Sequence, residues 1–239
     1  GWRESPAQAL VVGSVSVNES DIEVKYFLYQ PRSKQRREAQ RARLPLNQWR
    51  GLAHFISDRI HLKFAGMNGH FGSQILFIAE DGSATQRVKR LAMMDQDGHN
   101  IRYLSDGRNI VVTPRFSPDG REITYTEISN GRVQVILKHL VTGQQEVLET
   151  AQGTSTFSPR FSPDGRGIVY SLALNGNTDI YYMDLQTRGR ERVTTAPSAE
   201  TSPSVSPDGR LVAFESDRSG SQQIYVLNRQ TGQVRRISV

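Results

Sequence analysis

The heptad RFSPDGR occupies Arg115 to Arg121, and the same seven letters return at Arg160 to Arg166. A close variant, SVSPDGR, occupies Ser204 to Arg210. The copies are spaced by 45 and 44 residues, counted between Pro118, Pro163 and Pro207. In this phrase serine starts a turn, proline fixes φ, aspartate tolerates the third position, and glycine adopts the left-handed conformation without steric cost. Each copy therefore predicts a tight hairpin between two antiparallel strands.

The residues after each turn repeat at the same spacing. Apolar side chains alternate along the next stretch, which predicts a strand with one buried face. The matching pairs are Ile123 and Tyr125, Ile168 and Tyr170, and Val212 and Phe214. Equivalent third and fourth strands carry Val135 and Leu148, Ile180 and Val193, and Ile224 and Ile237. Four short strands per repeat, none able to bury both faces alone, predict the blades of a β-propeller.

An incomplete repeat lies before the first heptad. A strand is expected at Ile75 to Ile78, and Leu91 and Leu104 match later apolar positions in the repeat. No SPDG hairpin precedes Ile75, so this blade begins at its second strand. Propellers commonly complete their first blade with a strand from the other end of the chain. We therefore expect about four blades here, and a full protein that continues beyond Val239 with further blades.

The first 70 residues have a different pattern. Apolar stretches at Ala9 to Val17 and Ile22 to Tyr29 flank a polar turn and predict an antiparallel hairpin. A helix is expected next, with Asn47 as its N-cap and Gly66 as its end. We therefore predict a multi-domain protein, in which a small α+β domain (residues 1–70) precedes an all-β propeller (residues 71–239). Strand-like sequence so near the start suggests that the first elements of the α+β domain are absent.

Composition narrows the classes of partner. The formal net charge of +6 points to acidic partners, and six basic residues lie between Arg32 and Arg43. No aromatic residue accompanies them, so we interpret this segment as a solvated connection and expect no nucleic-acid partner. The chain has no cysteine, which excludes disulfides and thiolate metal sites. No apolar run approaches the roughly 18 residues of a membrane span.

Acidic residues in the turns are candidates for calcium binding, but a structural role is favoured. Asp119, Asp164 and Asp208 stand where the turn itself requires aspartate, and no other acidic residue repeats with them to complete an oxygen cage. The stretch 95–98, Asp-Gln-Asp-Gly, lacks the glycine and the glutamate that complete an EF-hand loop. We therefore expect a hairpin turn at 95–98.

The predicted helix carries a second candidate metal set. His54, Asp58 and His61 share one side of it. A zinc site of this type needs a further ligand and supporting hydrogen bonds, and the sequence shows neither. We expect a local pair between the histidine and the aspartate instead. No metal and no cofactor is predicted.

The order of these parts resembles the TolB family of Tol-Pal system proteins. The segments that carry the resemblance are NQWRGLAHFISDRI at 47–60, RVKRLAMMDQDGHNIRYLS at 87–105 and the SPDG repeats. It covers nearly the whole chain and implies an N-terminal α+β domain, a six-bladed propeller and a periplasmic location. The implied partners are the peptidoglycan-associated lipoprotein Pal and the inner-membrane Tol proteins, through which the protein associates peripherally with the envelope. The implied role is to maintain outer-membrane integrity and to take part in cell division.

Pal is expected to dock where the segments that enter the innermost strands converge at one mouth of the propeller. These mouth segments are residues 109–114, 154–159 and 199–203. Small hydroxyl groups and one aromatic ring on rigidly held backbone suit recognition. The candidate partner-binding residues are Thr113, Pro114, Ser155, Phe157, Ser158, Thr201 and Pro203. The alternative stays open that the prolines only shape the strands and that Phe157 only caps the core.

A propeller also precedes the catalytic domain in peptidases of the prolyl-oligopeptidase type, which is the alternative function. The sequence contains no G-x-S-x-G nucleophile elbow, and no histidine stands in a context typical of a catalytic base. The strand-rich pattern also lacks the alternating helices of an α/β-hydrolase. We therefore predict a non-catalytic scaffold.

Overall fold

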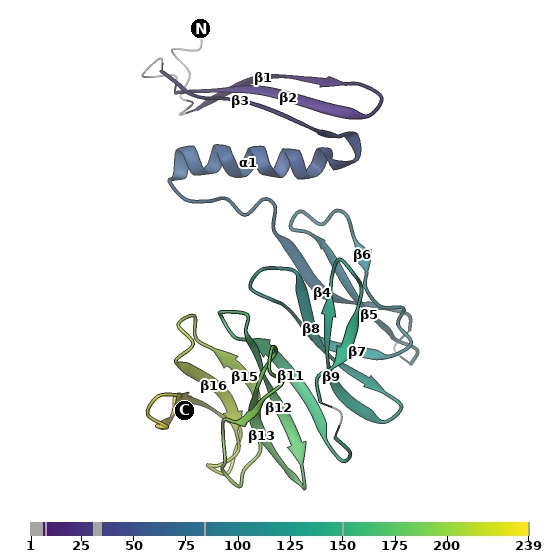
Figure 1. Cartoon of the computed structure of the whole chain (residues 1–239), viewed down its shortest axis with the longest axis vertical. Helices are drawn as coiled ribbons and strands as arrows, with labels where there is room; N and C mark the ends of the chain where they lie inside the picture. The colour runs from purple at the N-terminus through teal and green to yellow at the C-terminus, as the bar shows by residue number, and fades with distance from the viewer. Residues whose placement is uncertain (1–6, 8, 31–34, 84, 150, 239) are drawn as a thin grey trace. The chain divides into compact units, whose positions relative to one another are not determined.

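The computed structural model describes residues 7, 9–30, 35–83, 85–149 and 151–238. The chain divides into two compact units, and Figure 1 shows the elements of both. The first unit comprises Gly1–Ile75 and Met94–Ile101, and the second comprises Leu76–Met93 and Arg102–Val239. The first unit is therefore discontinuous, because it includes a turn between two strands of the first propeller sheet. Among the described residues, no helix is long and apolar enough to cross a membrane.

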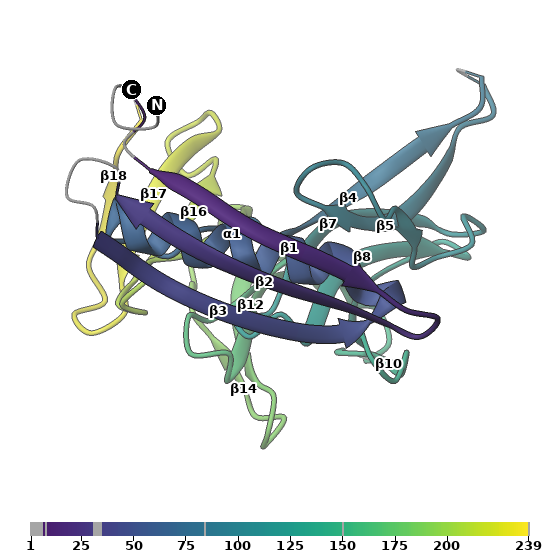
Figure 2. The ribbon, with the colours of Figure 1, turned by 90° about the horizontal axis from the view of Figure 1, so that it is seen from above.

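The first unit contains a three-stranded sheet and a helix. Its strands β1 (Leu10–Val17), β2 (Asp21–Gln30) and β3 (Gln35–Pro45) are antiparallel and follow one another in the sheet. The predicted hairpin is confirmed as β1 and β2. Figure 2 shows the three strands lying across α1 (Trp49–Ala65). The buried side chains of this layer are Tyr26, Leu28 and Leu52.

The end of α1 is confirmed, and its predicted beginning is wrong. Gly66 terminates the helix with a φ of 72°, in the left-handed region that glycine adopts freely. Asn47 does not cap the helix, because it lies inside a 3-10 turn (Leu46–Gln48) that leads from β3 into α1. That turn is fixed by a hydrogen bond from the Leu46 N–H to the Ser20 carbonyl, so the chain enters the helix without a side-chain cap.

The basic segment is a strand, so the prediction of a solvated connection is wrong for residues 35–45; residues 31–34 lie outside the described residues. Two of its arginines pair across the sheet with acidic residues of β2. Arg41 binds Glu23 at 2.6 Å, and Arg43 binds Asp21 at 2.7 Å. On the helix side of β3, the Glu38 carboxylate accepts from Arg59 and Lys63 of α1. Cross-strand charge pairs therefore stabilise a strand that lacks apolar alternation.

The second unit consists of successive antiparallel sheets, which confirms the repeat of four short strands. Three sheets have four strands each and are called blades 1, 2 and 3. Blade 1 contains β7 (Ile110–Phe116), β8 (Glu122–Ser129), β9 (Arg132–His139) and β10 (Gln145–Val147). Blade 2 contains β11 (Ser155–Phe161), β12 (Gly167–Leu174), β13 (Asn177–Asp184) and β14 (Arg190–Arg192). Blade 3 contains β15 (Glu200–Val205), β16 (Leu211–Ser216), β17 (Gln223–Asn228) and β18 (Val234–Arg236).

The first sheet of the propeller has three strands, as the sequence predicts. These are β4 (Gln74–Asp81), β5 (Val88–Asp95) and β6 (Arg102–Tyr103). The apolar core lies between sheets, because each buried cluster joins residues of two successive ones. Leu91 of β5 packs with Tyr125 of blade 1, Val135 of blade 1 with Tyr170 of blade 2, and Ile180 of blade 2 with Phe214 of blade 3. Stacking of sheets therefore buries the faces that no blade covers alone.

The repeated heptad forms the turn that was predicted for it. In blade 2 the Ser162 hydroxyl donates to Asp164 at 2.6 Å and accepts the Gly167 N–H at 3.0 Å. The same carboxylate accepts the Arg166 N–H, and Gly165 has a φ of 70°. The other two heptads make the same bonds. These donors lower the pKa of each turn aspartate, so its carboxylate is used to close the turn.

Candidate functional site

The three mouth segments are built alike around a bulge. β7, β11 and β15 are the first strands of their blades, and each shows a register shift after its third or second residue. The residue before the proline of each bulge has a positive φ without being glycine. Thr113, Ser158 and Ser202 have φ values of 53°, 53° and 56°. A left-handed residue of this kind costs about 1–2 kcal/mol and persists only where surrounding contacts hold it.

Buried hydroxyl groups hold these bulges, from the preceding blade in blades 2 and 3 and from the same blade in blade 1. The Thr126 hydroxyl on β8 accepts the Ser158 N–H at 3.1 Å and lies 2.9 Å from the Thr113 hydroxyl. At the equivalent place in blade 2, the Ser171 hydroxyl accepts the Ser202 N–H at 3.2 Å. Thr126 and Ser171 are buried. The backbone of one mouth segment is thus tied to the second strand of the preceding blade, which makes the mouth a pre-organised surface.

The predicted partner-binding residues lie in strands rather than in loops. Thr113 and Pro114 belong to β7, Ser155, Phe157 and Ser158 to β11, and Thr201 and Pro203 to β15. Most of these side chains are partly exposed, but Pro203 is buried and shapes its strand. Thr201 donates to the Glu215 carboxylate at 3.3 Å, so its hydroxyl already has a partner. Apart from Pro203, the candidates are all half-buried, so each still presents part of its side chain for contact.

Sequence reasoning did not single out Thr126 and Ser171. Both occupy the same position of the repeat, in strands whose neighbouring positions are buried. A hydroxyl that recurs at one core position is the signal that could have identified them, because buried polar groups require partners. Sequence reasoning also did not single out Arg115 and Arg160, the residues that directly follow the prolines of the bulges in blades 1 and 2.

The helical metal set is not assembled. Asp58 accepts the Phe71 and Gly72 N–H groups, and His61 lies 3.1 Å from the Met67 carbonyl oxygen. His54 instead faces Asp97, at 3.4 Å from Nε2 to the carboxylate. The predicted local pair between His54 and Asp58 is therefore wrong, because the carboxylate is engaged by the chain that follows the helix.

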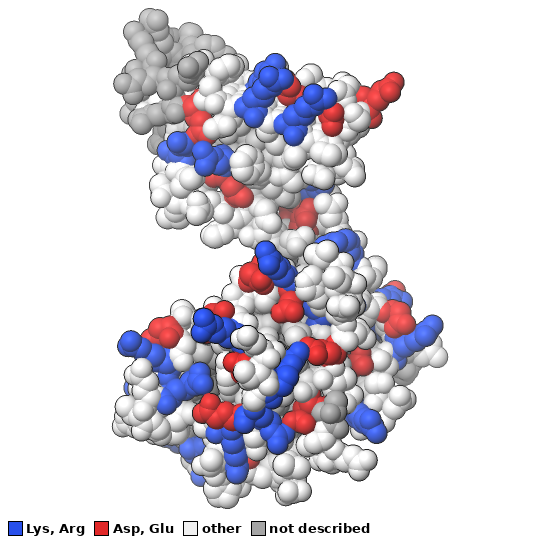
Figure 3. Space-filling model, viewed as in Figure 1, with Lys and Arg blue, Asp and Glu red and all other residues white. Residues whose placement is uncertain are grey.

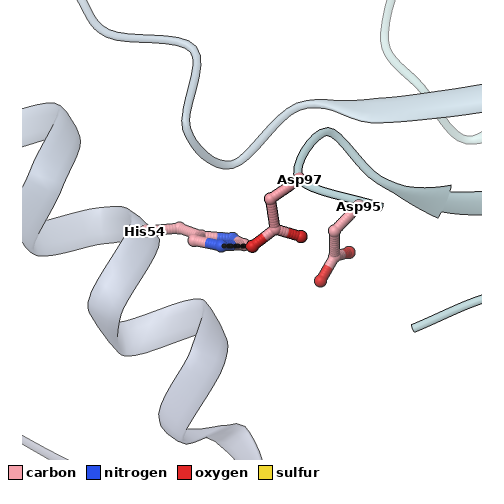
Figure 4. A group of neighbouring side chains, drawn as sticks. All are labelled: His54, Asp95 and Asp97. Atoms are coloured by element: carbon pink, nitrogen blue, oxygen red, sulfur yellow. Dashed lines mark ion pairs between the residues drawn. The ribbon is translucent and has the colours of Figure 1, made fainter. Parts of the chain in front are cut away.

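His54, Asp95 and Asp97 form the group shown in Figure 4, whose ligand atoms lie within 4.8 Å of one another. Arg50 of α1 also lies in this group, with an ion pair to Asp97 and its Nε 3.5 Å from Asp95. Partial burial opposes ionisation of Asp97, but the His99 N–H and the Arg50 guanidinium outweigh it and lower its pKa to about 2. The Arg50 guanidinium supplies the positive charge that a metal ion would supply. Its ion pair with Asp97 and the contact of His54 with Asp97 hold the 95–98 turn against α1. That turn is the hairpin turn predicted, with the Gly98 N–H bound to the Asp95 carbonyl.

Charged side chains of both signs share the surface. On the face shown in Figure 3, lysine and arginine are interspersed with aspartate and glutamate. Ion pairs between them include Arg190 with Glu149 and Arg192 with Asp179 at 2.8 Å. The expectation of no nucleic-acid partner stays a prediction.

Comparison with known proteins gives a family and several similar folds. The family model described as "TolB beta propeller domain" matches residues 61–239. The crystal structure of TolB from Acinetobacter baumannii is 29% identical with a TM-score of 0.85, over 100% of this chain and 59% of that chain. The chain thus spans less than two thirds of the length of that TolB. Both findings agree with the resemblance drawn from the motifs.

Two further solved structures are similar in fold. A puromycin-hydrolysing peptidase from Mycobacterium tuberculosis has a TM-score of 0.59 at 14% identity, over 98% of this chain and 38% of that chain. Oligogalacturonate lyase in complex with manganese has a TM-score of 0.53 at 18% identity, over 98% of this chain and 55% of that chain. At these identities the similarity shows the fold alone.

Proposed function

The chain belongs to the TolB β-propeller domain family, and on that premise we propose that it acts as a non-catalytic periplasmic scaffold of the Tol-Pal envelope complex. In this role it binds the peptidoglycan-associated lipoprotein Pal through the mouth segments and supports outer-membrane integrity and cell division. Contact with the inner-membrane Tol proteins belongs to the same proposal.

One observation carries the proposal: each mouth segment holds a left-handed residue at a bulge, and those of blades 2 and 3 are tied by hydrogen bonds to the preceding blade. The bulge recurs in all three blades and belongs to their common frame, and the rigid backbone it gives suits a binding surface, since a rigid site loses less conformational entropy on association. Phe157 and Ser158 are then presented on backbone that cannot relax. The peptidase-like neighbours support the shared fold but no catalytic role, so we favour the scaffold.

Binding of the lipid-free domain of the cognate Pal tests this proposal. The full-length protein is titrated with that domain by calorimetry, and Phe157→Ala and Thr201→Ala are compared with it. A residue at the centre of an interface costs about 2 kcal/mol or more when truncated, so we expect at least one variant to weaken binding more than tenfold. Val141→Ala is the matched control, because Val141 is 86% exposed in a turn outside the mouth segments. Unchanged binding in both mouth variants would rule out these segments as the docking site.

A further inference from the structure

Two arginines occupy equivalent places on neighbouring innermost strands. Arg115 of β7 and Arg160 of β11 each follow the proline of a bulge directly, and each opens a heptad. In the strand registers, Arg115 lies opposite Thr124 and Arg160 opposite Val169, so they hold the same position of their blades. β7 and β11 also contact each other. The repeat thus places two arginines at equivalent positions of contacting strands, directly after the mouth segments.

Neither guanidinium has an acidic partner in the described part of the chain. Arg115 donates from Nη1 to the Pro114 carbonyl at 2.7 Å, and Arg160 donates to the Pro159 carbonyl at 2.9 Å. Each bond uses one of the five N–H donors that a guanidinium carries. Arg192 shows the contrast, since it binds both oxygens of Asp179. Donors therefore remain available on both Arg115 and Arg160.

The pair is electrostatically unfavourable as it stands. Burial and the nearby charge of Arg115 lower the pKa of Arg160 to about 10. Arg115 and Arg160 thus stand as like charges on contacting strands, and Arg160 is partly removed from water. Like charges held together in this way are destabilising, and an anion bound between them would relieve the repulsion. A guanidinium is well suited to this, because its planar fork matches the two oxygens of a carboxylate.

We propose that Arg115 and Arg160 form an anion-binding site on the innermost strands, and that its ligand is a carboxylate side chain of the protein that docks on the mouth segments. This inference rests on the proposed function for the source of the carboxylate, but not for the site itself. Blade 3 has Ser204 at the equivalent position, so of these three blades only blades 1 and 2 supply an arginine there. A carboxylate of the partner that binds these arginines therefore determines which blades the partner faces.

The test replaces both arginines and compares a variant of equal charge. Arg115→Gln/Arg160→Gln removes the site, whereas Arg121→Gln/Arg166→Gln removes the two arginines at the other end of the same heptads. The Arg121 side chain is exposed and pairs with Asp119 within its own turn. Affinity for the lipid-free Pal domain is measured at several salt concentrations. We expect the first variant to bind at least about tenfold more weakly, with a flatter salt dependence, and the control to bind within about twofold of the wild type.

Each outcome separates the site from the proposed function. If the wild-type protein binds Pal and the first variant binds equally well, the site is wrong and the proposed function stands. If the wild-type protein does not bind Pal, the proposed function fails, and the anion-binding site is tested separately with small anions. Nitrogen-15 NMR of the arginine Nε–H groups is then followed during titration with acetate and, separately, with inorganic phosphate. Shifts confined to Arg115 and Arg160 support the site with a free anion as its ligand, and their absence overturns it.

The test remains possible even if the double variant is less stable than the wild type. Replacing the pair removes repulsion, so the midpoint of thermal unfolding should not fall. If it does fall, Arg115→Gln alone carries the experiment, because Arg115 is exposed. A single variant with wild-type stability and wild-type affinity would refute a role for Arg115 in binding.

Discussion

The hydroxyl of Thr126 joins two blades, and its removal should destabilise the propeller. Thr126→Val keeps the shape of a buried side chain but deletes the acceptor of the Ser158 N–H and the partner of the Thr113 hydroxyl. Thr126 is 2% exposed, so water cannot readily replace the lost bonds. The left-handed backbone at Thr113 and Ser158 then has fewer contacts to hold it.

The size of the effect follows from the bonds that are lost. A neutral hydrogen bond contributes about 1 kcal/mol net, and a donor left without a partner costs about 1–3 kcal/mol. Ser158 is only partly buried, so its N–H regains some hydration in the variant. We therefore expect a loss of about 2 kcal/mol in the free energy of unfolding.

Equilibrium urea unfolding of the wild type and the variant measures this loss, with equal slopes required for the comparison. Thr124→Val is the matched control, since Thr124 is buried on the same strand and its hydroxyl donates to the Ile136 carbonyl inside one blade. An under-satisfied carbonyl costs less than an orphaned N–H, so the control should lose no more than about 1 kcal/mol. Equal losses in the two variants would refute the reasoning that bonds between blades hold the bulges.

Three further variants test other parts of the molecule. Ser171→Ala should cost about 1 kcal/mol in urea unfolding, half the effect of Thr126→Val, because it leaves only the Ser202 N–H without an acceptor; no change would contradict this. Arg218→Ala should cost about 3 kcal/mol because it leaves the fully buried Glu200 carboxylate without its cation, and a loss below about 1 kcal/mol would mean that water solvates that carboxylate. Asp97 has a pKa of about 2 in the folded protein against an ordinary 3.8, so its contribution to stability is present above about pH 4 and is lost as the pH falls towards about 2. Asp97→Asn should therefore flatten the pH dependence of the urea midpoint in that window, and an unchanged slope would show that the Arg50 pair contributes nothing.

The propeller could be predicted from sequence because its signal is local and repeated. The turn chemistry of Ser162, Pro163, Asp164 and Gly165 acts within a few residues, and it fixes where each strand begins and ends. Alternating apolar residues then give the face of each strand. Both signals recur at nearly constant spacing, so an accidental match in one repeat is not shared by the others.

The strand β3 and the bulges could not be predicted by the same reasoning. Residues 38–43 of β3 are polar or small and show no apolar alternation. The strand is held by pairs such as Arg41 with Glu23, which are adjacent only after the hairpin has formed. The bulges place threonine and serine in a conformation that glycine usually occupies. In blades 2 and 3 the bulge is held by a hydroxyl of the preceding blade, about 30 residues earlier in the chain. Long-range polar contacts of this kind leave little trace in local patterns.

The repeats themselves indicate which positions serve the fold and which are free for recognition. The turn residues, the apolar pair after each turn and the left-handed bulge recur in all three blades, because every blade must turn, stack and enter its strand in the same way. Beside the bulge the blades differ: Phe157 stands where blade 3 has Thr201, and Arg160 stands where it has Ser204. The same backbone supports all of these side chains, so folding does not require any one of them. A docking partner can distinguish the blades by the residues that differ at equivalent places on this rigid frame. We infer that it does so through Arg115 of blade 1 and Arg160 of blade 2.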